Sequence, residues 1–159
     1  MSTIPTKKPA VIAVREVMSD APVCHPWDTL ARACEVMRDR TTRWLAVRDS
    51  GGHAVGILTA RDACLAAIAR GRPLDAVPVE AAMHTDVHSC GPDDDVEDVL
   101  SAMQNYRVER MPVVDDGGKL VGDVALAALA HHVLARGLEG ILARTLASLA
   151  EPRSAAAPV

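Results

Sequence analysis

The sequence predicts an α+β fold in which two β-α-β-β-α units pack as a pseudo-twofold pair, followed by a C-terminal helix. Three observations lead to this prediction: an ungapped internal repeat, apolar stripes with helical spacing, and short apolar runs that end in paired glycines. One unit holds only about 60 residues and would be marginally stable alone. Packing two units together would bury a common core.

The repeat becomes visible when the 159-residue chain is shifted by 66 positions against itself. Nine of 31 aligned columns are then identical, without a gap. The identical pairs are Pro26 and Pro92, Asp28 and Asp94, Met37 and Met103, Val47 and Val113, Asp49 and Asp115, Gly51 and Gly117, Gly52 and Gly118, Val55 and Val121, and Gly56 and Gly122. Upstream, residues 15–18 match 80–83 with a slip of one residue. The two segments are therefore expected to share one structure.

Each unit begins with a short helical lead and a short strand, and a helix follows. Cys24 and Cys90 occupy similar places in the first strand of each unit. The apolar positions of the two helices follow the spacing i, i+3, i+4, i+7, which places them on one face. They are Leu30, Ala33, Cys34 and Met37 in the first unit, and Val96, Val99, Leu100 and Met103 in the second.

A hairpin and a second helix complete each unit. The outgoing strands are expected at 44–47 and 111–114, and the returning strands at 53–58 and 119–124. The turns between them contain paired glycines, which tolerate positive φ. The second helices are expected at roughly 61–69 and 125–135. The expected domains are thus residues 10–70 and 79–136, joined by a linker at 71–78.

The tail predicts a helix over residues 137–150. One helical side carries Leu138, Ile141, Leu142, Thr145, Leu146 and Leu149. Ile141, Leu142 and Leu146 are too apolar to remain in water, so this side either packs back on its own module or contributes to a dimer. Residues 1–9 and 151–159 are rich in Pro, Ala, Ser and Lys, which predicts flexible ends.

Composition excludes several classes of function. Aromatic residues make up 2% of the chain and the net charge is −4, which argues against base stacking and phosphate-backbone binding, and hence against a nucleic-acid partner. The most apolar run, 124–135, is shorter than the roughly 20 residues that span a bilayer. The first fourteen residues lack the long apolar core of a signal peptide. We expect a soluble cytoplasmic protein with no membrane partner and four reduced thiols.

The stretch from Gly56 to Asp62 is the strongest candidate site. It predicts a strand that runs into a helix N-terminus, where free N–H groups and the helix dipole favour an anion. Thr59 and Asp62 also have the spacing of a capping box, which would explain both residues without a ligand. The matching junction, Gly122 to Ala128, has alanine in both columns. There Asp123 replaces Ile57, and it is expected either in or beside a second cleft or as a helix cap.

The chain resembles a tandem pair of CBS domains, a Bateman module, over about residues 10–135. It is also similar to the stand-alone two-CBS proteins common in actinobacteria. The residues that carry the resemblance are Val17, Met18, Pro26, the helices of Met37 and Met103, residues 111–115, the double-glycine turns, Gly56, Thr59 and Asp62. The resemblance implies a cleft for an adenine nucleotide or related adenosyl ligand, no tightly bound cofactor, and a regulatory role as a homodimer that acts on a separate effector protein. The candidate ligands are AMP, ADP, ATP, NAD and S-adenosylmethionine.

The same resemblance implies roles for residues of the first unit. Asp62 would hold the ribose hydroxyls, and Thr59 would bind ribose or phosphate. Arg61 would neutralise phosphate, or a basic residue from the facing unit, such as Arg107 or Arg110, would do so. The cleft walls would come from Val23, Cys24, His25, Leu45, Ala46, Val47 and Ile57. Ala46 stands where the second unit has the family's usual proline, Pro112, which leaves the shape of the first cleft open. We expect at most one well-formed nucleotide site per chain.

Other interpretations remain open. The module could be a structural dimer or a protein-interaction adaptor with vestigial clefts. Arg107, Glu109 and Arg110 alternate with apolar residues, which favours a solvated strand edge over a phosphate clamp. A metal site is disfavoured because the histidine pairs lack ligand spacing, and a redox role of Cys24 and Cys90 is disfavoured because buried cysteine commonly fills space. No nucleophile motif is present, so we do not expect an enzyme.

Overall fold

The computed structural model describes residues 12–134 and 139–150. These residues form the expected α+β fold, with five α-helices and two small sheets. They divide into two compact units, and each unit contains segments of both repeats. We call Ser19–Gly91 with Met111–Asp123 the sheet unit, and the described parts of 1–18, 92–110 and 124–159 the helical unit. The expected domain boundaries remain a prediction.

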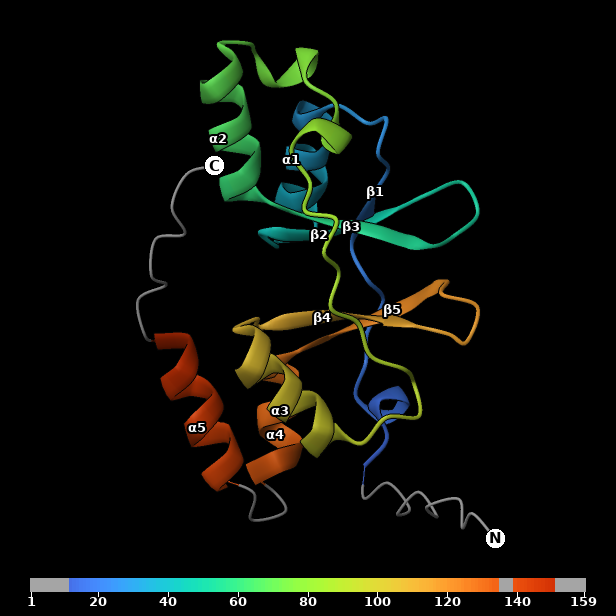
Figure 1. The fold of residues 1–159 in the computed structure, drawn as a ribbon, viewed down its shortest axis with the longest axis vertical. Helices are drawn as coiled ribbons and strands as arrows, with labels where there is room; N and C mark the ends of the chain where they lie inside the picture. The colour runs from blue at the N-terminus through green and yellow to red at the C-terminus, as the bar shows by residue number, and fades with distance from the viewer. Residues whose placement is uncertain (1–11, 135–138, 151–159) are drawn as a thin grey trace, which may run out of the picture. The chain divides into compact units, whose positions relative to one another are not determined.

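The sheet unit contains a three-stranded sheet of order β1-β2-β3. Its strands are β1 (Val23–Cys24), β2 (Trp44–Arg48) and β3 (Ala54–Thr59). β1 runs parallel to β2, and β2 runs antiparallel to β3. Helices α1 (Leu30–Asp39) and α2 (Ala60–Arg70) cover one face of this sheet (Figure 1). The hairpin and the two helices lie where the sequence predicts them.

The core of the sheet unit lies between these helices and the sheet. Alternate residues of a strand point to opposite faces, and the residues facing the helices are buried. The core includes Cys24, Leu30, Ala33, Met37, Leu45, Val47, Leu58, Ala63, Ala66, Val77 and Val79. Three of the four predicted α1 positions are fully buried, and Cys34 is half-buried against the same core. Val77 and Val79 come from the segment that holds the short 3-10 helices η2 (Leu74–Ala76) and η3 (Val79–Ala81).

The second hairpin consists of β4 (Arg110–Val114) and β5 (Leu120–Ala125). The boundary between the two units passes through the ends of these strands. Inside the sheet unit, Cys90 bridges Val113 in parallel, as Cys24 pairs with Val47. The glycines Gly52 and Gly118 take φ values of +91° and +77°, a conformation that glycine adopts without strain. The paired-glycine turns are therefore confirmed.

The helical unit contains η1 (Val14–Glu16), α3 (Val96–Tyr106), α4 (Leu126–Leu134) and α5 (Glu139–Ala150). All four predicted apolar positions of α3 are buried. The N–H of Val14 donates to the carbonyl of Asp94 at 3.0 Å, so the lead of the first repeat joins the helix of the second. Arg107 ends α3 in the left-handed conformation, with φ of +55°. Its expected place on a strand edge is therefore wrong, because β4 begins only at Arg110.

Helix α5 packs on α3 within the helical unit, as Figure 1 shows. Leu142 and Thr145 are buried, and the Thr145 hydroxyl donates to the carbonyl of Ile141 at 3.0 Å. The Ser148 hydroxyl donates to the carbonyl of Gln104 on α3 at 3.0 Å. Packing on its own module is thus confirmed for Leu142, whereas Leu146 is 52% exposed in the single chain and does not pack there. A dimer contact of Leu146 stays a prediction. Thr145, the residue before Leu146, is the one that is buried against α3.

Several sequence expectations fall on residues that are not described. These are the flexible ends at 1–9 and 151–159, the first two residues of the first expected domain, and positions 135–138 with Leu138.

The four cysteines are free thiols in different surroundings. Cys24 and Cys90 are buried, Cys34 is half-buried and Cys64 is exposed. Burial, with a smaller contribution from the charge of Asp28, raises the pKa of the Cys24 thiol to about 12. Burial and the neighbouring Cys64 raise the pKa of Cys34 as well. Because the thiolate is the reactive form, Cys24 has the character of a core residue.

Gly56 lies where the segment after η3 crosses β3. A Cβ atom on Gly56 would lie 2.7 Å from Met83 Sδ and 3.1 Å from the His84 carbonyl oxygen. We predict that Gly56→Ala lowers the free energy of unfolding by about 1–3 kcal/mol, because overpacking forces this crossing segment to move. Chemical denaturation measures the change. The matched control is Gly140→Ala in α5, where a Cβ meets nothing within 4 Å and where we expect a gain of about 0.5–1 kcal/mol. Equal stability of the parent and the Gly56 variant would contradict the steric argument.

The thiols should react in the order of their exposure, and the raised pKa of Cys24 should make it the slowest. In native protein at pH 8 we expect iodoacetamide to modify Cys64 first and Cys24 last, as followed by peptide mass spectrometry.

Between the ordinary thiol pKa of 9.0 and about 12, the folded state keeps the Cys24 proton and the unfolded state loses it. The free energy of unfolding should therefore fall as pH rises through this window, by roughly 1 kcal/mol per pH unit. Cys24→Ala should remove this part of the slope. Native Cys24 that reacts as fast as Cys64 would contradict the assignment.

Candidate functional site

The candidate site is the junction at which β3 passes into α2. Thr59 is the N-cap of α2, and its side-chain oxygen accepts the N–H of Asp62 at 3.2 Å. The N–H of Thr59 in turn donates to Asp62 Oδ2 at 3.0 Å. These two bonds make the capping box that the spacing of Thr59 and Asp62 allowed. Both residues thus hold the start of the helix, whether or not they also bind a ligand.

Both carboxylate oxygens of Asp62 have partners within the protein. The Thr59 hydroxyl donates to Oδ2 at 2.6 Å, and His84 Nε2 lies 2.9 Å from Oδ1. The Asp62 side chain is 16% exposed and that of His84 is 65% exposed. Each carboxylate oxygen has two lone pairs, so Oδ1 can accept one more hydrogen bond. Arg61, the second residue of α2, is exposed to solvent beside this carboxylate.

His84 reaches Asp62 because its backbone pairs with β3. The N–H of Ile57 donates to the His84 carbonyl at 2.9 Å, and the N–H of His84 donates to the Ile57 carbonyl at 2.8 Å. This pairing also brings Met83 against Gly56. His84 and His88 form one of the histidine pairs disfavoured as a metal site, and the sequence alone does not predict the contact of His84 with Asp62.

The internal repeat contains the signal that identifies His84. Ser19 and Asp123 form the same two-bond antiparallel bridge, with N–H to carbonyl distances of 2.9 and 2.8 Å. Asp123 matches Ile57 in the repeat, and Ser19 follows Met18 as His84 follows Met83. The residue after each lead methionine therefore pairs with the returning strand of the other repeat.

Asp123 is buried, with 1% of its surface exposed. The Ser19 hydroxyl donates to its Oδ1 at 3.1 Å. This contact gives the carboxyl group a polar partner, which a buried carboxyl group requires. Its neighbour Gly122 lines a pocket, so Asp123 lies next to a residue of that pocket.

The predicted cleft walls divide between two faces of the three-stranded sheet. Val23 pairs with Ala46, and Ala46 pairs with Ile57, so these three side chains share one face. Val23 and Ile57 are half-buried there, and Ala46 is fully buried.

Three other predicted wall residues need correction. Cys24, Leu45 and Val47 belong to the core beneath α1 and α2, because strand alternation turns them toward the helices. Their side chains are used in packing and do not face the Val23 side of the sheet. A ligand-contacting wall therefore remains a prediction for Val23, Ala46 and Ile57.

His25 is held by its own neighbours. Its N–H donates to Asp28 Oδ2 at 2.8 Å, and its Nδ1 lies 2.7 Å from the carbonyl oxygen of Arg48. The imidazole stacks on the Trp27 ring, with centroids 4.9 Å apart and planes within 1° of parallel. Trp27 is 58% exposed, so the stack lies at the surface. These bonds connect β1 to the end of β2.

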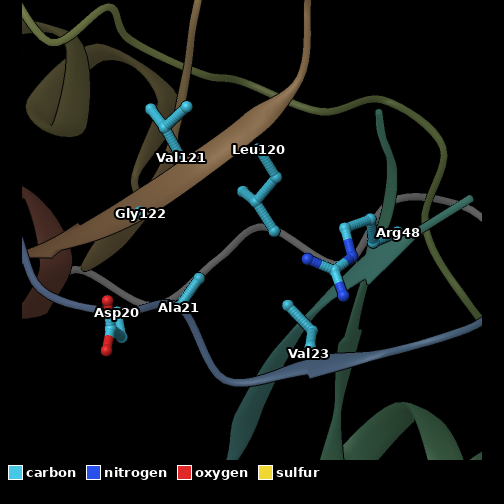
Figure 2. A pocket seen from close by; sticks show the side chains of 7 residues that line it. All are labelled: Asp20, Ala21, Val23, Arg48, Leu120, Val121 and Gly122. Carbon is cyan, nitrogen blue, oxygen red and sulfur yellow. The ribbon is translucent and has the colours of Figure 1, made fainter. Parts of the chain in front are cut away.

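A pocket of about 210 Å³ lies in the sheet unit. Figure 2 shows its lining, which comes from β1 and the segment before it, from the end of β2 and from the first half of β5. The lining residues are Asp20, Ala21, Val23, Arg48, Leu120, Val121 and Gly122. Val23 is the predicted wall residue among them, whereas Thr59 and Asp62 do not line this pocket. Arg48, which is not among the predicted site residues, supplies its cation.

The remaining predicted cations are distributed differently. Arg107 and Arg110 belong to the helical unit and not to the sheet unit that holds Asp62. Among residues 12–134 and 139–150, no group of three or more His, Cys, Asp or Glu side chains could hold a metal ion. Within the same ranges, no helix is long and apolar enough to cross a membrane.

Comparison with known proteins identifies the repeat. The family model for the CBS domain matches residues 14–68 and 79–135. An uncharacterised 17.7 kDa protein of Acidianus ambivalens is 37% identical over 112 residues, which cover 70% of this chain and 66% of that protein. Hypoxic response protein 1 of Mycobacterium tuberculosis is 24% identical over 120 residues, which cover 75% of this chain and 83% of that protein. The chain thus spans about two thirds of the length of the first of these relatives.

A solved structure with the same fold is the CBS domain pair of protein MJ0100, in complex with 5′-methylthioadenosine and S-adenosyl-L-methionine. It matches with a TM-score of 0.68 and 25% identity, over 79% of this chain and 98% of that one. The two family matches coincide with the two copies of the 66-residue repeat. The chain therefore belongs to the CBS-domain family, as a tandem pair of CBS domains.

Proposed function

We propose that the protein is a regulatory module that senses an adenine nucleotide or a related adenosyl ligand through Asp62 and Thr59. In this proposal it has no catalytic activity and lies in the cytoplasm. It acts as a homodimer on a separate effector protein. The observation that carries the proposal is the polar junction of β3 and α2, together with adenosyl ligands bound by a CBS pair of the same fold.

The chemistry of the junction suits a ribose. A 2′,3′-diol presents two O–H donors, and a carboxylate accepts both. Asp62 Oδ2 already accepts two hydrogen bonds, so the diol would use Oδ1. His84 holds that oxygen but is 65% exposed, so its side chain has room to turn toward solvent. Ligand binding would then exchange one hydrogen-bond partner of Oδ1 for another.

The N-terminus of α2 suits the anionic part of a nucleotide. The helix has 11 residues, and the positive end of its dipole lies at its first turn. The N–H groups of Ala60 and Asp62 already donate to the Arg43 carbonyl and to Thr59 Oγ1, so among the described residues the N–H of Arg61 is the one left for an anion. Arg61 adds an exposed cation in the same turn. The matching junction in the second repeat has Ala125 and Ala128 in place of Thr59 and Asp62. This difference supports one nucleotide site per chain.

A second candidate function is a structural dimer or protein-interaction adaptor with vestigial clefts. The observation in its favour is that both carboxylate oxygens of Asp62 already have protein partners without a ligand, Thr59 on Oδ2 and His84 on Oδ1. In this case the two polar residues serve only the helix cap and the crossing segment.

Ligand-dependent stabilisation distinguishes the two functions. We expect at least one of AMP, ADP, ATP, NAD and S-adenosylmethionine to raise the melting temperature, with a stabilisation of about 2.7 kcal/mol at a concentration of 100 Kd. Asp62→Ala should abolish this shift, because the ribose loses its acceptor. Differential scanning fluorimetry measures both effects.

The control is Thr29→Ala, which removes the equivalent N-cap of α1. The side-chain oxygen of Thr29 accepts the N–H of Arg32 at 3.1 Å, in the same unit but at another helix. This variant should lose about 1 kcal/mol of stability and keep the ligand shift. An Asp62→Ala protein that binds as well as the parent would show that Asp62 is only a cap. A titration with two equal nucleotide sites per chain would contradict the single-site proposal.

Removal of the competing imidazole should strengthen nucleotide binding. In His84→Ala the Oδ1 atom of Asp62 is free before the ligand arrives, so we expect affinity to rise roughly fivefold, equivalent to about 1 kcal/mol for one hydrogen bond. Isothermal titration with the nucleotide that stabilises the parent measures the change. His132→Ala, an exposed position on α4, should leave the affinity unchanged. Weaker binding by His84→Ala would mean that the imidazole itself supports the ligand.

A further inference from the structure

We propose that the pocket of the sheet unit binds a small zwitterion with an aliphatic body, of the class of the amino acids. This site is separate from the proposed nucleotide site, since its lining does not include Thr59 or Asp62. It depends on two opposite charges, Asp20 and Arg48, and on the apolar side chains of Val23 and Leu120, which lie near Arg48 (Figure 2).

The geometry places the two charges at opposite sides of one small space. Figure 2 shows the Arg48 guanidinium and the Leu120 side chain reaching into the pocket, with Asp20 across from Arg48. Arg48 lies where the β2–β3 register shifts, between Val47 and Arg48. Such an irregularity re-aims the side chain that follows it. The carbonyl of Arg48 is also held by His25 Nδ1 at 2.7 Å, which fixes the backbone beneath the guanidinium.

Neither charge has a partner among the residues that the structure describes. Within residues 12–134 and 139–150, the side chains of Asp20 and Arg48 make no hydrogen bond or ion pair. Asp20 is exposed, whereas Arg48 is half-buried. The repeat has Val114 in the column of Arg48, so the fold does not need a cation at that place. Asp123 follows the lining residue Gly122, and its buried carboxyl group accepts a hydrogen bond from the Ser19 hydroxyl at 3.1 Å.

These features define the class of ligand. A guanidinium binds a carboxylate through two parallel hydrogen bonds, and a carboxylate accepts from an ammonium. A molecule with both groups would neutralise Arg48 and Asp20 together. Val23 and Leu120 offer an apolar surface for its side chain. The volume of about 210 Å³ is below the roughly 300–1,000 Å³ of pockets that bury larger ligands, which favours an amino acid over a whole nucleotide.

Titration of the full chain with the twenty standard L-amino acids tests the proposal. We expect at least one to bind by isothermal titration and to raise the melting temperature. Its two analogues that lack the ammonium or the carboxylate should each bind at least about tenfold more weakly, because one charged pairing is lost. The proposal is overturned if none of the twenty binds, or if either analogue binds as tightly as the amino acid.

Variants locate the binding in this pocket. Arg48→Gln and Asp20→Asn should each weaken amino-acid binding at least about tenfold, and Arg48→Lys should fall between Arg48→Gln and the parent because it keeps the charge but not the paired geometry. Arg72→Gln and Asp75→Asn, exposed residues outside the pocket, are the matched controls and should bind as the parent does. Circular dichroism confirms that each variant is folded. Unchanged binding by both Arg48→Gln and Asp20→Asn overturns the proposal.

The outcome is independent of the proposed nucleotide site. Asp62→Ala should keep amino-acid binding, and Arg48→Gln should keep any nucleotide-dependent shift. The inference is overturned if the amino acid and a nucleotide compete for binding and Arg48→Gln loses the binding of both ligands. That result would show one shared site. Loss of nucleotide binding in Asp62→Ala alone bears only on the proposed function.

Discussion

The arrangement of the sheet unit depends on a crossed backbone pairing. After each lead methionine, one residue pairs with the returning strand of the other repeat: His84 with Ile57, and Ser19 with Asp123. Each pairing satisfies one N–H and one carbonyl group on both sides, and buried backbone groups need such partners. The close approach explains why β3 carries a glycine at position 56. It also brings His84 to Asp62 and places Asp20 beside the strand that contains Gly122.

The same polar groups can serve both stability and recognition at the β3–α2 junction. Thr59 and Asp62 satisfy each other's backbone N–H groups, and this fixes the carboxylate in one orientation. A fixed acceptor loses little freedom when a ligand arrives, which favours binding. A structural cap and a binding group are therefore compatible roles for Asp62. What a ligand must overcome is the hydrogen bond from the exposed side chain of His84.

The two repeats have diverged in where they place charge. The first repeat keeps a hydroxyl and a carboxylate at the start of its second helix, and the second has alanines there. The second repeat instead buries Asp123 in its returning strand, in contact with Ser19. Arg48 of the first repeat is matched by Val114. One backbone plan thus supports two different polar surroundings, one at Asp62 and one around the pocket of Asp20 and Arg48.

The sequence by itself determined the repeat, the hairpins and the buried stripes of α1 and α3, because periodicity and paired glycines are local signals. It also determined the capping spacing of Thr59 and Asp62. It could not say which face of the sheet Leu45 or Val47 would take, because a run of apolar residues shows no alternation. Nor could it place Leu146, since α5 meets α3 through Leu142, Thr145 and Ser148.

Only the tertiary structure brought His84 to Asp62 and grouped Asp20 with Arg48. The first pair is 22 residues apart in the chain, and the pocket joins segments from both repeats. Such contacts depend on long-range strand pairing, which no local pattern encodes. The repeat nevertheless aligns His84 with Ser19 and Ile57 with Asp123, so one of these pairings predicts the other. The physical reason for both contacts is the same, because each unpaired edge residue of a returning strand requires a backbone partner.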